Sequence, residues 1–98
     1  MGDESKTAEA RGDDALPHVD FSTFVLSLSH SALMHLGEAP SPETGKVEQD
    51  LALARQTIDL LGMLEEKTRG NLTGEEERLI AQILFELRMR YVERSKTK

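Results

Sequence analysis

The stretch from Phe21 to Leu36, FSTFVLSLSHSALMHL, decides the fold of this chain. It contains no Asp, Glu, Lys or Arg, although these four residue types make up 31% of the sequence. Long apolar side chains recur in it at the spacing of helix turns, which predicts an amphipathic helix. Such a helix would be about 24 Å long, shorter than the ~30 Å hydrocarbon core of a bilayer, so we do not expect it to cross a membrane.

The predicted helix has more apolar surface than one neighbouring helix can cover. At about 100° per residue, Leu26 and Leu33 form a second stripe beside a broad apolar face. Hydroxyl groups, a methionine and His30 fill the remaining sector instead of charges, which indicates that the helix is covered on more than one side. Asp20 is expected to cap its N-terminus, and Gly37 is expected to end it in the left-handed conformation. The broad face comprises Phe21, Phe24, Val25, Leu28, Ala32, His35 and Leu36.

The length and composition limit what the chain can be. With 98 residues it forms one small domain at most, and a domain of this size has little stability to spare, which favours oligomerisation. Because the chain has no Cys, disulfides, thiolate zinc sites and cysteine nucleophiles are excluded, and a reducing cytoplasm is a compatible compartment. The net charge of -6 argues against nonspecific nucleic-acid binding by the whole protein.

Three segments outside the periodic stretches are predicted to be irregular. Residues 1–19 are polar, acidic and without periodicity, which is typical of a disordered tail. Residues 37–46 contain two prolines and two glycines and are predicted to form a loop. Residues 95–98 form a basic C-terminal end, which has two interpretations. Its cations offset the dipole of a helix C-terminus, or they bind RNA or a membrane surface. The cations clustered toward this end of the chain, within residues 75–98, are Arg88, Arg90, Arg94, Lys96 and Lys98.

The second predicted helix begins at Asp50, a plausible N-cap, and runs to Arg69. Apolar residues share one of its faces and charged residues lie opposite. Gly62 lies inside this helix, at the edge of the apolar face. Since a glycine in mid-helix costs about 1 kcal/mol relative to alanine, we interpret Gly62 as a packing position that another helix, most simply the first, approaches closely. The apolar face comprises Leu51, Leu53, Ala54, Thr57, Ile58, Leu60, Leu61 and Leu64.

The sequence around residues 68–76 marks the boundary between the second helix and a third. Gly70 is expected to close the second helix, and Thr73 to open the third, with Glu76 completing a capping box. The third helix is predicted to run to Arg94, antiparallel to the second because the connection is short. Its main face comprises Leu79, Ile80, Ile83, Leu84, Leu87 and Tyr91, and a second seam comprises Ala81, Phe85 and Val92.

These patterns together predict an all-α fold, a three-helix domain within residues 20–94 with helices at about 20–37, 50–69 and 73–94. The stretches FSTFVLSLSHSALMHLGEAPSPETG, ARQTIDLLGMLEEKTRGNLTGEEERLI and LRMRYVE resemble small bacterial proteins of the domain of unknown function 1844 family. The similarity spans about residues 19–93 and is most specific over residues 58–73. The resemblance implies a mostly helical bacterial protein of the cytoplasm, and it implies no activity and no catalytic residues.

No constellation of residues in the sequence carries a recognisable chemistry. The H-E-x-x-H, P-loop and G-x-G-x-x-G motifs are absent, and no His is preceded by Glu three positions earlier. His30 and His35 are five residues apart, so they point about 140° apart on a helix and one metal ion cannot easily take both. Two copies of His35 could meet across a symmetric dimer. We nominate no catalytic residue, no metal ligand and no cofactor, and we do not expect an enzyme.

Three classes of function stay open. The favoured one is a non-enzymatic helical protein that acts through self-association or through binding to a protein partner. The alternative is a small ligand- or metal-binding bundle that uses His35 and the serine-rich back of the first helix. The third is a nucleic-acid accessory protein that acts through the basic C-terminal end.

A homodimer is the specific form of association that the sequence favours. Three helices can each bury one face against the other two, which leaves Leu26, Leu33, Phe85 and Val92 without an assigned neighbour. Burying one such side chain contributes about 1.5–3 kcal/mol, and closed two-fold dimers are the commonest oligomers. We therefore predict an interface that contains these four residues and lies near the first helix. The alternative is a monomer whose irregular packing buries these four side chains in its own core.

Overall fold

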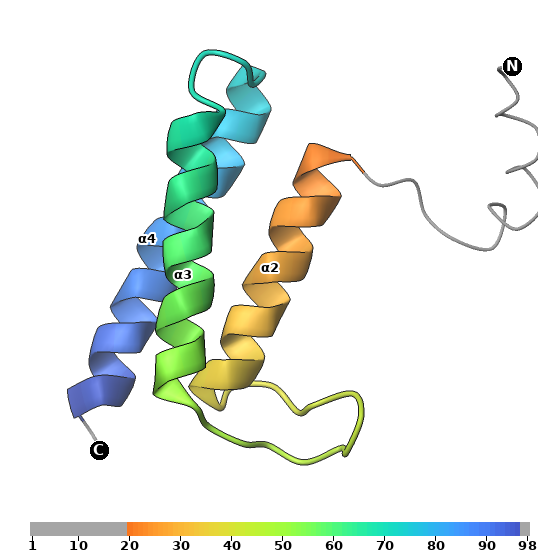
Figure 1. Cartoon of the computed structure of the whole chain (residues 1–98), viewed down its shortest axis with the longest axis vertical. Coiled ribbons are helices and arrows are strands. Elements are labelled where there is room, and N and C mark those ends of the chain that lie inside the picture. Colours follow the sequence, from red (N-terminus) through yellow and green to blue (C-terminus); the bar gives the residue numbers. More distant parts are fainter. Residues whose placement is uncertain (1–19, 97–98) are drawn as a thin grey trace, which may run out of the picture.

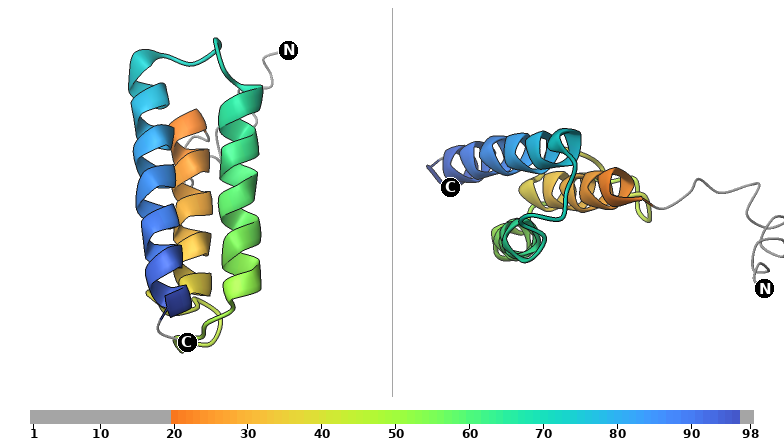
Figure 2. Two further views of the ribbon diagram at one scale, coloured as in Figure 1. Left: turned by 90° about the vertical axis from the view of Figure 1, so that its left-hand side faces the viewer. Right: turned by 90° about the horizontal axis from the view of Figure 1, so that it is seen from above.

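The computed structural model describes residues 20–96, which form three α-helices and no strand. They are α2 (Phe21–Leu36), α3 (Leu51–Lys67) and α4 (Gly74–Lys96). Helices α2 and α4 run in the same direction and α3 runs antiparallel to both (Figure 1). Each helix packs against the other two, so the three form a bundle (Figure 2). The predicted all-α, three-helix fold is confirmed, while the predicted tail at residues 1–19 and the last two residues of the basic C-terminal end lie outside the described residues.

Each helix begins at a side chain that satisfies the free backbone N–H groups of its first turn. The Asp20 carboxylate accepts from the Thr23 N–H at 2.8 Å, and Asp50 accepts from Leu53 at 3.1 Å. At α4, the Thr73 hydroxyl accepts from the Glu76 N–H at 3.1 Å while the Glu76 carboxylate accepts from the Thr73 N–H at 2.9 Å. This reciprocal pair is a capping box, and it is built from residues three positions apart.

Glycines in the left-handed region follow α2 and α3. Gly37 has a φ of 84°, and its N–H donates to the Met34 carbonyl at 3.0 Å. Gly70 has a φ of 87°, but α3 ends at Lys67, two residues before the predicted Arg69. The Leu64 carbonyl accepts from both the hydroxyl and the N–H of Thr68, at 2.7 and 3.0 Å. The Arg69 N–H donates to the Glu66 carbonyl, three residues back, so the last turn tightens before the glycine. Helix α4 extends to Lys96, two residues beyond the prediction.

The core takes three side chains from each helix, all from the predicted main faces. These faces nevertheless extend further round α2 and α3 than the bundle covers. Phe24, Leu53 and Leu60 were expected inside and are 44%, 42% and 44% exposed. Thr57 is buried, and its hydroxyl donates to the Leu53 carbonyl at 3.0 Å, so it adds no unpaired polar group to the core. The buried apolar residues are Val25, Ala32, Leu36, Ala54, Ile58, Leu61, Ile80, Leu84 and Leu87.

The loop between α2 and α3 is fastened to the end of α2. The Asp50 N–H donates to the His35 carbonyl at 2.7 Å, and the Gln49 side-chain amide donates to the Leu36 carbonyl at 3.2 Å. These bonds satisfy carbonyls that the end of a helix leaves free, and they bring the start of α3 beside the end of α2. At the start of the loop, the Glu38 N–H donates to the Leu33 carbonyl at 2.9 Å, which holds Glu38 at the end of α2, where its side chain reaches α4.

None of the three helices is long and apolar enough to cross a membrane.

Candidate functional site

The histidines of α2 do not gather with other ligating groups. Within residues 20–96, no group of three or more His, Cys, Asp or Glu side chains is placed to hold a metal ion. His30 is exposed, and His35 is partly buried, with its backbone carbonyl occupied by the N–H of Asp50. The features of the described residues that can carry a function are therefore an ion-pair cluster and two apolar surfaces.

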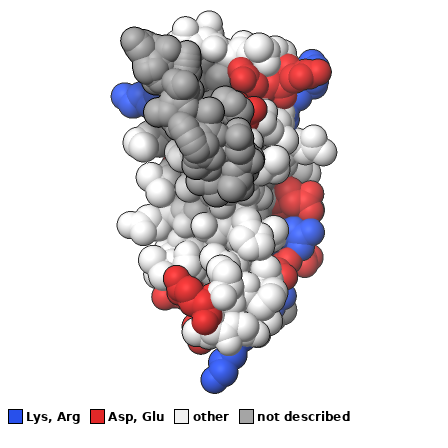
Figure 3. All heavy atoms as spheres, turned by 90° about the vertical axis from the view of Figure 1, so that its right-hand side faces the viewer, with Lys and Arg blue, Asp and Glu red and all other residues white. Residues whose placement is uncertain are grey.

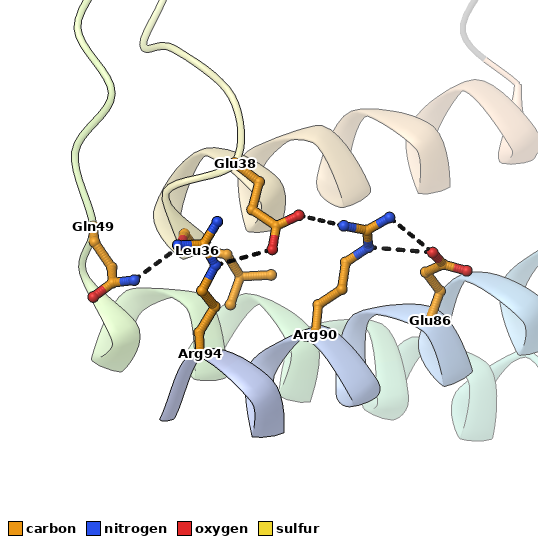
Figure 4. Close-up of polar contacts among 6 residues, drawn as sticks. All are labelled: Leu36, Glu38, Gln49, Glu86, Arg90 and Arg94. Carbon is orange, nitrogen blue, oxygen red and sulfur yellow. Dashed lines mark hydrogen bonds and ion pairs between the residues drawn. The ribbon is translucent and has the colours of Figure 1, made fainter. Parts of the chain in front are cut away.

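The ion-pair cluster joins the α2–α3 loop to the C-terminal half of α4 (Figure 4). Glu38, whose side chain is only 18% exposed, accepts from Arg94 Nε at 3.1 Å and also pairs with Arg90. Arg90 in turn donates from Nη2 and Nε to the Glu86 carboxylate, at 2.9 and 3.2 Å. The hydrogen bond to Glu86 and the nearby charge of Glu38 raise the pKa of Arg90 above its ordinary value. The cluster therefore holds a permanently charged guanidinium between two carboxylates.

The ion pairs change the interpretation of the basic C-terminal end. Arg90 and Arg94 already meet carboxylates of the same chain, so their charges are largely neutralised at the surface. A nucleic-acid site gains its affinity from cations that are free to pair with phosphates. The paired arginines thus favour a structural role, which links α4 to the first residue after the left-handed Gly37.

Replacing Glu38 by glutamine is expected to lower the free energy of unfolding by about 1 kcal/mol, because two partly buried arginine contacts lose a charge-assisted partner. The exposure of both arginines limits the size of the effect. Glu43→Gln is the matched control, since Glu43 is exposed in the same loop. Urea unfolding of both variants measures the difference, and equal stability of the two would show that the cluster contributes nothing.

The first apolar surface is the outward side of α2, formed by the exposed residues Phe24, Leu26, Ser27 and His30, which we call the α2 face. Leu26 is 53% exposed and lies on a shallow groove between α2 and α4. Figure 3 shows this side of the molecule, where uncharged atoms predominate and Lys, Arg, Asp and Glu side chains lie toward the edges. The absence of charge is unusual for a helix side exposed to water.

The second apolar surface lies on the other side of α4, along its junction with α3. Phe85, Met89 and Val92 are 66%, 52% and 51% exposed and follow one another at i, i+4 and i+7. Three hollows along this junction share lining residues, so they form one groove, which we call the α4 groove. Its α3 side includes Glu65 and Ile58.

The four predicted interface residues therefore do not share one surface. Leu26 and Leu33 line the hollow between α2 and α4, where Leu33 is half-buried against the core. Phe85 and Val92 line the α4 groove. Helix α4 lies between the two pairs. Leu26 and Leu33 are on its side toward α2, and Phe85 and Val92 are on its side toward α3. One flat contact cannot cover all four.

Gly62 lies opposite α4, not opposite α2 as expected. A Cβ atom at this position would be 3.0 Å from Nη2 of Arg88. The missing side chain leaves room for the guanidinium to lie against α3. The neighbour at Gly62 is therefore the end of a flexible arginine side chain of α4 and not an atom of α2, and the role of Gly62 as a packing position stays a prediction.

The model of a protein family, described as a domain of unknown function (DUF1844), matches residues 18–93 of the chain. The chain belongs to the DUF1844 family. The match covers most of the sequence and includes α2, α3, Glu38 with its partner Arg90, and the residues of α4 that line its groove, while Arg94 follows the last matched residue. Searches of the curated proteins and of the solved structures found no match. DUF1844 membership therefore agrees with the resemblance noted in the sequence and brings no activity with it.

The sequence analysis missed two residues of this DUF1844 chain that contribute to these features. Met89 belongs to the exposed stripe of α4, and its spacing from Phe85 and Val92 was sufficient to find it. Glu38 gave no local signal, because its arginine partners are 52 and 56 residues away in the sequence.

Proposed function

We propose that this protein is a non-enzymatic association module of the bacterial cytoplasm that forms a homodimer through the α2 face. The observation that carries the proposal is the composition of α2, whose sixteen residues include no Asp, Glu, Lys or Arg although Phe24, Leu26, Ser27 and His30 are exposed. Charged residues are depleted from the buried centre of protein interfaces, whereas helix sides that stay in water usually carry them.

The comparison with α3 supports this assignment. Helix α3 also has an outward side, and that side carries Arg55, Asp59, Glu66 and Lys67, with Arg55 and Asp59 3.9 Å apart as an ion pair. A helix of the same bundle therefore follows the usual rule for a solvated surface, and α2 departs from it. A second copy placed on α2 by a two-fold axis would cover the uncharged side of both chains. The absence of Cys agrees with a reducing compartment.

Light scattering on the full chain tests the dimer. A mass of about twice the 10.9 kDa of one chain is expected, and Leu26→Glu is expected to reduce it to that of one chain, because a carboxylate would be buried in the contact. Circular dichroism checks that the variant is still helical. Leu26 is the better target than Leu33, since Leu33 also packs on the core and its loss would weaken the fold itself.

Val92→Glu is the matched control, because Val92 is as exposed as Leu26 and lies on the opposite flank of α4. It is expected to leave the dimer intact. A wild-type mass near 10.9 kDa would overturn the homodimer. A dimer that survives Leu26→Glu but not Val92→Glu would move the interface to the α4 groove and overturn the role of α2.

A further inference from the structure

Arg88 lines the α4 groove toward its Val92 end and pairs with no carboxylate among the described residues. It lines two of the three hollows that make up the groove, and its Nη2 atom lies across the groove beside Gly62 of α3. Arg90 and Arg94, on the other flank of the same helix, are both paired with carboxylates. Within residues 20–96, Arg88 has neither an ion pair nor a side-chain hydrogen bond, although Glu65 and Glu93 line the same groove.

Exposed apolar side chains flank Arg88 along α4, beside the charged residues that also line the groove. Phe85 precedes Arg88 by three residues and Val92 follows it by four, and both are more than half exposed. A partner that covered these side chains would also remove water from Arg88. Burying a charge without an opposite charge is costly, and neither Glu65 nor Glu93 pairs with Arg88, so a partner that covers this part of the groove is expected to supply a carboxylate to it.

The shape of the groove defines the rest of the partner. It follows α4 from Glu77 to Val92, which corresponds to about 22 Å of helix. The exposed stripe on its α4 side has the i, i+4, i+7 spacing that matches the apolar side of another helix. A long, open groove of this kind suits an extended helical segment better than a small molecule, which prefers an enclosed pocket.

We propose that the α4 groove binds an amphipathic helix of another protein, whose apolar side carries a carboxylate that pairs with Arg88. This surface is separate from the α2 face, so the inference goes beyond the proposed dimer. A protein with both contacts would bring two copies of a helical partner together.

The test uses two synthetic helical peptides and the full chain. Both peptides carry leucines spaced i, i+4 and i+7, and they differ only at one central residue on the leucine side, which is glutamate in one and glutamine in the other. Fluorescence anisotropy measures their dissociation constants. The glutamate peptide is expected to bind about tenfold more tightly, because a charge-assisted hydrogen bond is roughly twice as strong as a neutral one.

Variants of the protein locate the effect. Arg88→Gln is expected to abolish the preference for the glutamate peptide, and Phe85→Glu is expected to weaken the binding of both peptides. Arg78→Gln is the control, since Arg78 is exposed on the same helix but lines none of the three hollows, and it should keep the preference. Equal binding of the two peptides by the wild type, no saturable binding of either, or binding that Phe85→Glu leaves unchanged would each overturn the proposal. Leu26→Glu should not affect the peptides, so a failure of the dimer and a failure of the groove are distinguishable.

Discussion

Replacing Leu61 by alanine is expected to lower the free energy of unfolding by about 2–5 kcal/mol. Leu61 lies near the middle of α3 and is fully buried, and it belongs to the core that all three helices share. Truncation removes the apolar contacts of the leucine and leaves a cavity that the surrounding helices fill only partly. The free energy of unfolding of a whole domain is about 5–15 kcal/mol, so the variant loses a large share of its stability.

The neighbouring Leu60 supplies the control. It is 44% exposed, so Leu60→Ala removes less buried surface and is expected to cost about 1 kcal/mol or less. Urea unfolding of both variants should be compared at one protein concentration, because dimer formation would make stability depend on concentration. Equal losses at the two positions would mean that α3 is rotated relative to the described core.

Enlarging Ala54 to leucine is expected to destabilise the domain by about 1–3 kcal/mol, even though it adds apolar volume. Ala54 is fully buried at the start of α3, in the same core cluster as Ala32 of α2. Interiors are packed to the density of organic crystals, so three extra carbon atoms force neighbouring side chains or a helix to move.

Ala52→Leu separates packing from helix propensity. Ala52 lies two residues earlier on the same helix and is exposed. Leucine is nearly as good a helix former as alanine, so this variant is expected to stay within about 0.5 kcal/mol of the wild type. Thermal unfolding of the pair gives the comparison. A stable Ala54→Leu variant would reveal free space between the helices and would contradict the close packing.

The positions of the helices were predictable because their limits depend on near neighbours in the chain. Asp20 bonds a backbone group three residues ahead, and Thr73 and Glu76 bond each other across the same interval. Such contacts form whenever the local segment becomes helical. The end of α3 was missed by two residues because the Arg69 N–H bonds the Glu66 carbonyl, three residues back, and the glycine rule alone does not include such a tightened last turn.

The core residues were also predictable, but the width of the covered face was not. Periodicity identified every buried apolar side chain on all three helices. It placed Phe24, Leu53 and Leu60 among them as well, and these stay exposed. A helical pattern shows which side chains share a face, whereas the rotation and spacing of the neighbouring helices decide how much of that face is covered.

The sequence by itself determined the all-α class, the three helices, their caps and the residues of the core, since all of these follow from spacing within one segment. The tertiary structure alone decided that Glu38 meets Arg90 and Arg94, that Gly62 faces Arg88, and that the predicted interface residues fall on two sides of α4. These relations join residues on different helices. They depend on how far each helix is rotated about its own axis relative to its neighbours in the packed core. The pattern of residues within a single helix does not determine that rotation.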